Sequence, residues 1–207
     1  MALKGSFRVL HCLTGDLISE VLHTLNSWLE AHQGEVIILD FQHLYQFTEA
    51  DHHHLVRMVL TQFHGKLCSW TEDLRLLTLH HLTSRGVQVV VIYPAAGGCQ
   101  PFLWPRSLCP SPWPDTMSVT DLLDNLTNHL AQHHKRQQPS LFVSQGVLTP
   151  SWRTVSFHPL SSVKSQCADR CRLPVLRWLE QESLRNNILI MDFVLPDNIN
   201  HIIDKNL

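Results

Sequence analysis

The feature that most constrains the fold of this chain is a repeated alternation between short β-branched runs and stretches of helical periodicity. Five apolar runs predict strands, at Phe7–His11, Glu35–Phe41, Val87–Tyr93, Ser140–Gln145 and Asn187–Val194. Between them, apolar residues recur at helical spacing over 17–29, 48–63, 119–134, 174–182 and 198–204. Because strands that alternate with helices pair in parallel through crossover helices, the sequence predicts an α/β fold.

Local signals refine this organisation. Asp16 stands where a helix N-cap is favoured, and Gly34 follows the same helix as its expected stop. The segment 94–118 is rich in Pro and Trp, and we expect an irregular loop there. No internal repeat or low-complexity linker divides the chain, so we predict a single domain over residues 1–207.

Composition excludes several functions. Of the 207 residues, 44% are apolar, and 16 basic against 18 acidic side chains give a formal charge of −2. Such a chain lacks the positive excess that nucleic-acid binding needs. The N-terminus has no apolar signal region, and the longest apolar runs are strand-sized, so we predict no transmembrane segment. The six cysteines show no short paired spacing, which favours reduced thiols and a cytoplasmic location.

One polar residue stands at or near the end of each predicted strand. These residues are His11, Asp40, Tyr93, Gln145 and Asp192. In parallel sheets and barrels, ligands bind beyond the carboxyl ends of the strands. A single strand-end Asp is often a helix cap, and a single His is often a hydrogen-bonded structural residue. Together, the five residues are candidates for one functional site.

At these positions the sequence resembles the X domain of phosphatidylinositol-specific phospholipase C, most closely that of the small proteins with only this domain. The matching motifs lie in family order, at Leu10–Cys12, Glu35–His43, Phe102–Pro105, Pro112–Thr116, Phe142–Pro150 and Ile188–Val194. The resemblance implies a distorted TIM-type (β/α) barrel. It also implies a phosphoric diester hydrolase that cleaves a phosphoinositide at a membrane surface, giving diacylglycerol and an inositol phosphate.

The same resemblance assigns roles to the candidate residues. The reaction uses two histidines, and His11 matches the general acid that protonates the leaving oxygen. Asp192 matches the carboxylate that orients the other histidine, as in a catalytic triad. Asp40 falls where the family places a polar residue near the inositol or the metal, and Tyr93 and Gln145 are weaker matches of the same kind, assigned to substrate binding.

Two family segments have no counterpart in this sequence. The strand with the first catalytic histidine and the strand with an Asp-x-Arg motif should both precede Phe7, but only six residues do. We therefore expect a truncated form whose barrel lacks its first two strands and which is catalytically silent. We predict no metal or cofactor, with calcium left open as the alternative, because the segment that usually holds its ligands has no counterpart here. The alternative function is a non-catalytic pseudoenzyme or a module that binds phosphoinositides or inositol phosphates.

Several other side chains invite competing interpretations. His52, His53 and His54 are consecutive on a predicted helix, so their side chains cannot converge on a metal. His129 and His133 could share a ligand on one helix face, but no nearby Glu completes a zinc-hydrolase motif. Both groups are therefore predicted to be solvated surface histidines. Cys167 and Cys171 alone do not make a structural zinc site. Trp28 and Trp178 are predicted core residues. Trp104 and Trp113 suit either a lipid interface or core packing.

Overall fold

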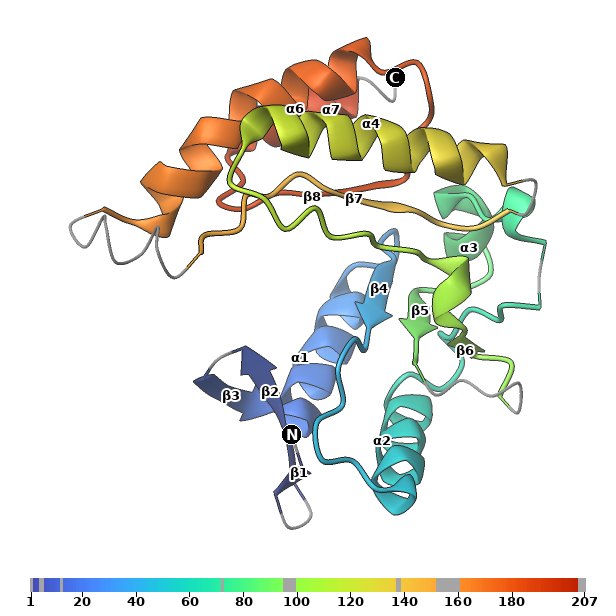
Figure 1. The fold of residues 1–207 in the computed structure, drawn as a ribbon. Coiled ribbons are helices and arrows are strands. Elements are labelled where there is room, and N and C mark those ends of the chain that lie inside the picture. Colours follow the sequence, from blue (N-terminus) through green and yellow to red (C-terminus); the bar gives the residue numbers. More distant parts are fainter. Residues whose placement is uncertain are drawn as a thin grey trace. The chain divides into compact units, whose positions relative to one another are not determined.

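The structure, a computed structural model, divides the chain into two compact units, Met1–Ser107 and Leu108–Leu207. It describes residues 2–3, 6–11, 13–71, 73–94, 100–136, 139–151 and 161–204. Within this part of the chain, strands alternate with helices along the sequence (Figure 1). This alternation confirms the predicted α/β class, and the single domain over 1–207 stays a prediction.

The strands of the first unit form two small sheets. They are β1 (Ala2–Leu3), β2 (Ser6–His11), β3 (Leu13–Leu17), β4 (Ile37–Asp40), β5 (Val89–Ile92) and β6 (Leu103–Trp104). The order β4-β5-β6 is parallel throughout, as expected. The parallel pairing expected for Phe7–His11 is wrong within the described residues, because β2 pairs antiparallel with both β1 and β3.

Two helices of the first unit begin close to their predicted positions, α1 (Ile18–Ala31) and α2 (Glu49–Gln62). Three short helical elements were not predicted: η1 (Leu74–Leu76), α3 (Leu79–Thr83) and, at the boundary of the unit, η2 (Arg106–Leu108). At the start of α2, Thr48 and Asp51 form a reciprocal capping box. Asp16 is not the N-cap of α1, because it lies in β3 and Leu17 occupies the cap position. A strand partner thus overrides the local capping signal.

The core of the first unit lies between its helices and the parallel sheet. Leu22 and Leu29 of α1, Leu55 and Val59 of α2, and the whole of β5 are buried, which removes their apolar surface from water. The burial of β5 on both faces confirms the interpretation of its β-branched run. The prediction that Trp28 is a core residue is wrong, since it is 41% exposed and stacks on His32.

The second unit places two helices over a pair of parallel strands. Its elements are α4 (Val119–Lys135), β7 (Val143–Gln145), the π-helical turn η3 (Lys164–Ala168), α6 (Asp169–Gln181), β8 (Ile188–Ile190) and α7 (Pro196–Asp204). Helices α4 and α6 lie side by side along the β7–β8 ladder (Figure 1). Their leucines and Trp178 form the core of this unit, which confirms the prediction for Trp178.

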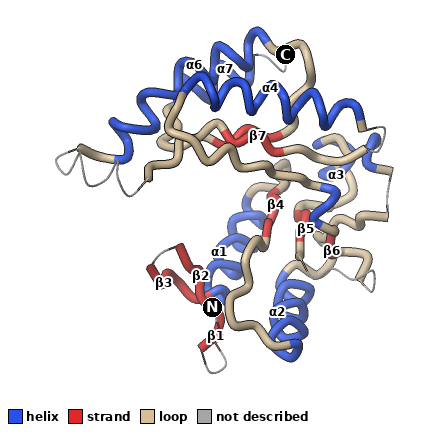
Figure 2. The backbone as a smooth tube through the Cα atoms, in the orientation of Figure 1, coloured by secondary structure: helices blue, strands red, loops and turns tan. Residues whose placement is uncertain are grey.

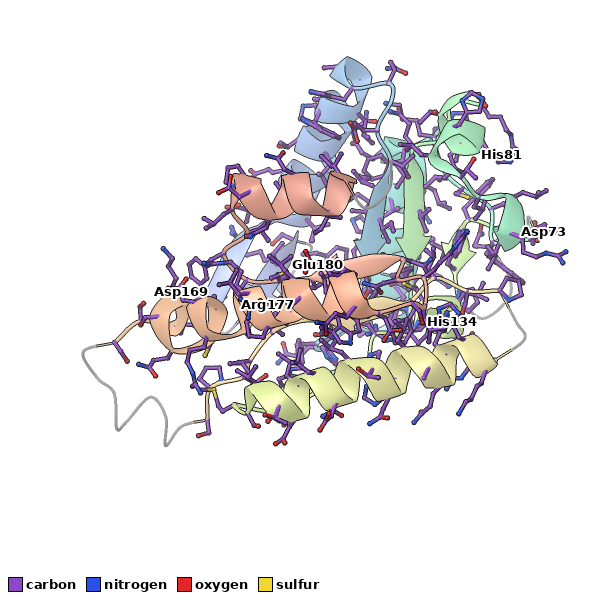
Figure 3. The ribbon with its side chains drawn as sticks, turned by 90° about the horizontal axis from the view of Figure 1, so that it is seen from above. Asp73, His81, His134, Asp169, Arg177 and Glu180 are labelled. Carbon is purple, nitrogen blue, oxygen red and sulfur yellow. The ribbon has the colours of Figure 1, made fainter. Side chains whose placement is uncertain are left out.

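Helix α6 begins before its predicted start. Pro174 lies inside the helix rather than at its first turn. The first turn instead holds an ion pair, in which Nη2 of Arg172 lies 2.8 Å from Oδ1 of Asp169. Asp169, Arg177 and Glu180 lie on its exposed side (Figure 3), opposite the buried Val175. The apolar spacing after Pro174 therefore marked the buried face correctly but not the helix boundary.

The predicted loop over 94–118 is largely correct. Between β5 and α4 the described residues are mostly irregular, apart from β6 and η2 (Figure 2). The short strand β6 nevertheless adds a third member to the parallel sheet, because Leu103 and Trp104 pair with Val91 and Ile92.

Candidate functional site

In the first unit, two predicted site residues stand at neighbouring strand ends. Asp40 is the last residue of β4, and Tyr93 directly follows β5. The two strands pair with Asp40 opposite Ile92, so both residues lie at the carboxyl edge of one parallel sheet. This is the edge at which α/β sheets bind ligands.

Tyr93 lies deep in this edge rather than on its surface. The side chain is 2% exposed, and its hydroxyl group is 2.8 Å from Nδ1 of His52 on α2. Burial raises the pKa of Tyr93 to about 12, so the phenol stays protonated at neutral pH. The interpretation of His52 as a solvated surface residue is therefore wrong. The substrate-binding role of Tyr93 stays a prediction.

Asp40 is held by two neighbours. Nε2 of Gln42 donates to its Oδ2 at 2.9 Å, and Nη1 of Arg106 lies 3.5 Å from its Oδ1. Arg106 was not among the predicted site residues. It follows β6 by two residues, and the apolar pair Leu103–Trp104 between Pro101 and Pro105 was the signal that could have marked a strand there.

A cavity of about 730 Å³ opens beside Asp40. Its wall is formed by β2, the apolar face of α1 and the segment that follows β4. Most of the lining is aliphatic or aromatic, and its polar members are Arg8, Asp40, Gln42 and His43. An apolar pocket with a few polar groups at this size is typical of a small-molecule site.

His11 ends β2 in the same unit, as the sequence predicts. Its side chain lies outside the described residues, so no contact is assigned to it. Its role as a general acid stays a prediction.

The second unit holds the other two predicted residues at the ends of neighbouring strands. Gln145 ends β7, and its Nε2 donates to the carbonyl oxygen of Ser111 at 3.1 Å and to its Oγ at 2.9 Å. Asp192 comes two residues after the end of β8 and is exposed. Because β7 and β8 are parallel, these two residues share one sheet edge. Their roles in binding and catalysis stay predictions.

Cys167 and Cys171 of this unit are buried thiols. Burial raises the pKa of Cys167 and of Cys171, and the negative charge of Asp192 acts in the same direction on both. Each thiol has a neighbour, Met117 Sδ for Cys167 and the carbonyl oxygen of Gly146 for Cys171. These contacts are typical of packed structural cysteines.

The histidines of α4 do not form a metal site. Burial lowers the pKa of His133, which stacks on Phe142. His134 donates through Nε2 to the carbonyl oxygen of Arg185 at 2.8 Å. Within the described ranges, no three His, Cys, Asp or Glu side chains are placed to share an ion. Because Asp40 faces the positive charge of Arg106, these residues also do not fit a calcium ion.

The two loop tryptophans have different environments. Trp104 is fully buried and donates through Nε1 to the carbonyl oxygen of Cys68. Of the two predicted alternatives, a core position is therefore confirmed for Trp104. Trp113 is 58% exposed and donates to Thr149 Oγ1. Among the described residues, no helix is both long and apolar enough to cross a lipid bilayer.

Comparison with known proteins identifies relatives but no matching family model. PI-PLC X domain-containing protein 3 of Mus musculus is 30% identical over 203 residues, which cover 95% of this chain and 62% of the relative. PI-PLC X domain-containing protein 2 of Mus musculus is 31% identical, with 95% and 58% covered. PI-PLC X domain-containing protein 1 of Homo sapiens is 29% identical, with 94% and 61% covered. The chain thus spans 58–62% of the length of these relatives.

A solved structure supports the fold. The phosphatidylinositol-specific phospholipase C from Listeria monocytogenes matches with a TM-score of 0.69 and 17% identity, over 97% of this chain and 74% of that chain. This likeness confirms the predicted α/β fold of the distorted TIM-barrel type, and an incomplete barrel is consistent with it. The chain is therefore similar to PI-PLC X domain-containing proteins along 95% of its own length, which corresponds to 62% of the Mus musculus relative.

Proposed function

We propose that the protein is a phosphoric diester hydrolase of the phosphatidylinositol-specific phospholipase C type. Its substrate is a phosphoinositide lipid at a membrane surface, and its products are diacylglycerol and an inositol phosphate. The observation that carries this proposal is the similarity to PI-PLC X domain-containing proteins over 95% of the chain. The fold likeness to a bacterial phosphatidylinositol-specific phospholipase C supports it.

In the proposed reaction the inositol 2-hydroxyl attacks phosphorus and the bond to the diacylglycerol oxygen breaks. His11 donates a proton to that leaving oxygen, because an alkoxide is a poor leaving group. The resemblance assigns Asp192 to orient the histidine that would accept the hydroxyl proton, and this sequence has no counterpart of that histidine. Asp40 lies at the end of its strand beside the cavity, where it serves head-group binding. The resemblance assigns head-group binding to Tyr93 and Gln145 as well, although Tyr93 is buried against His52.

One observation favours a second candidate, the non-catalytic binding module. The reaction uses two histidines, whereas His11 is the one histidine of this sequence that ends a predicted strand. A protein with the head-group residues and one histidine would bind the lipid without cleaving it.

We further propose that the protein works on the cytoplasmic face of membranes as a peripheral protein. The described cysteines Cys68, Cys109, Cys167 and Cys171 are thiols rather than disulfides, which fits a reducing compartment.

The deciding experiment measures inositol phosphate release from phosphatidylinositol vesicles. The hydrolase predicts release by the wild type and a loss of about 10²- to 10⁴-fold in His11→Ala, the usual contribution of a general acid. The catalytically silent form that the missing segments predict would release no inositol phosphate. His23→Ala, an exposed histidine on α1, is the matched control and should keep its activity. Lipid binding without release would favour the binding module, and neither binding nor release would contradict both candidates.

A further inference from the structure

Three parallel strands carry polar side chains to one sheet edge in the first unit. Asp40 ends β4, Tyr93 follows β5, and Arg106 comes two residues after β6. The strand register places Asp40 opposite Ile92 and Ile92 opposite Trp104. Arg106 therefore reaches across the end of the central strand to approach Asp40 on the far strand.

The contact between Asp40 and Arg106 is incomplete. Nη1 of Arg106 lies 3.5 Å from Oδ1 of Asp40, longer than the roughly 2.7–2.9 Å of a charge-assisted hydrogen bond. Both atoms are shielded from solvent, and within the described residues neither has a hydrogen-bond partner. A buried polar atom that lacks its hydrogen bond destabilises the protein, and more so when it is charged. An unsatisfied buried pair of this kind needs an explanation, and a ligand that completes the bonding supplies one.

The neighbours of the Asp40–Arg106 pair fix the carboxylate but leave the guanidinium accessible to a ligand. Gln42 donates to Oδ2 of Asp40 at 2.9 Å and so turns Oδ1 toward Arg106. The Arg106 side chain is 39% exposed, against 22% for Asp40. A guanidinium has five N–H donors, and its planar fork matches the oxygens of a phosphate group.

We propose that Arg106 is a substrate-binding residue whose guanidinium donates to a phosphate oxygen of an inositol phosphate head group, with Asp40 as its positioning residue. This inference rests on the proposed function and names the group that recognises the charged part of its substrate. In this inference Asp40 acts on the head group through Arg106 rather than by touching it, because its carboxylate holds the guanidinium at the sheet edge.

The first test compares binding by the wild type, Arg106→Gln and Arg106→Lys. Each protein is mixed with phosphatidylcholine vesicles with or without phosphatidylinositol, and separately with soluble inositol 1-phosphate and with inorganic phosphate. We expect Arg106→Gln to lose about 10- to 100-fold in affinity for phosphatidylinositol vesicles and inositol 1-phosphate, the loss of one charge-assisted hydrogen bond. Arg106→Lys should lose less, because it keeps the charge but not the fork. The exposed Arg57→Gln on α2 is the matched control and should bind as the wild type does.

The second test separates positioning from simple structural support. Asp40→Asn should weaken inositol 1-phosphate binding in the wild-type background. The double variant Asp40→Asn with Arg106→Gln should bind no more weakly than Arg106→Gln alone, because Asp40 acts through the guanidinium. Losses that multiply in the double variant would contradict the positioning role.

The outcomes distinguish this inference from the proposed function. Wild-type affinity in a folded Arg106→Gln protein would overturn the inference, even if the protein cleaves phosphatidylinositol. Binding that depends on Arg106 but yields no cleavage would leave the inference standing and contradict the hydrolase. Binding of inorganic phosphate as tightly as inositol 1-phosphate would overturn the head-group assignment, and no binding by the wild type would overturn both proposals. If Arg106→Gln does not fold, Arg106→Lys decides, since undiminished affinity in that variant contradicts recognition by the planar guanidinium.

Discussion

At the scale of single residues, the contact between Tyr93 and His52 fixes a strand end to a helix. The Tyr93 hydroxyl group lies 2.8 Å from His52 Nδ1 and is shielded from water. We expect His52→Phe to destabilise the protein by about 1–3 kcal/mol, because the hydroxyl group stays buried without its partner. Urea unfolding measures this loss, with the exposed His53→Phe as control. In a Tyr93→Phe background the same substitution should cost less, and an equal cost there would contradict the explanation.

The protonation of the same tyrosine predicts how stability depends on pH. Burial raises the pKa of Tyr93 to about 12, from an ordinary value of 10.0. The unfolded chain therefore loses this proton first. Stability should be fully present below about pH 10 and fall, by at most about 1.4 kcal/mol per pH unit, as the pH rises toward 12. Unfolding free energies measured across this window should fall less steeply in Tyr93→Phe, whereas Tyr45→Phe, an exposed tyrosine, should follow the wild type.

At the scale of elements, Gly146 sets how closely β7 approaches α6. A Cβ atom at this position would lie 2.8 Å from Val175 Cγ1 and 3.3 Å from the carbonyl oxygen of Ile190. We expect Gly146→Ala to cost about 1–3 kcal/mol in urea unfolding, since the strand must move away from the helix. Gly34→Ala, where a Cβ meets nothing within 4 Å, is the control. Adding Val175→Ala to Gly146→Ala should recover part of the loss, and no recovery would count against this contact.

Elements with strong local patterns could be predicted from the sequence. The β-branched run of β5 is buried on both faces, and Thr48 caps α2 where that helix was expected to begin. Elements that depend on a distant partner could not. Leu17 continues the apolar face of a helix, yet it lies in β3 and pairs with Arg8 of β2. The two residues of β6 form a strand only because β5 lies beside them.

In the candidate site too, residues marked by local patterns could be predicted and residues that depend on distant partners could not. Asp40, Tyr93 and Gln145 end or directly follow predicted strands, so position alone selected them. Arg106 was not predicted as a site residue, because the strand before it is too short to produce a periodic signal. The His52 contact joins residues 41 positions apart, and no local pattern encodes a pair at that separation.

At the scale of the whole molecule, each compact unit has a core of its own. Cys68 in the first unit and Cys167 in the second are both fully buried, so each thiol reports when its unit opens. The match to the Mus musculus relative runs through both units, and the structural likeness covers 97% of the chain. We therefore expect the two units to unfold together, as the predicted single domain requires.

Thiol labelling in increasing urea tests this cooperativity. Burial raises the pKa of Cys167 and so lowers the fraction of its reactive thiolate form. Labelling of this thiol therefore requires that its unit unfolds. Peptide mass spectrometry can follow Cys68 and Cys167 in one sample, with tryptophan fluorescence as the global control. Coincident midpoints for both cysteines and for the fluorescence are expected. Separate midpoints would show that Met1–Ser107 and Leu108–Leu207 are independent domains, and the single-domain prediction would then be wrong.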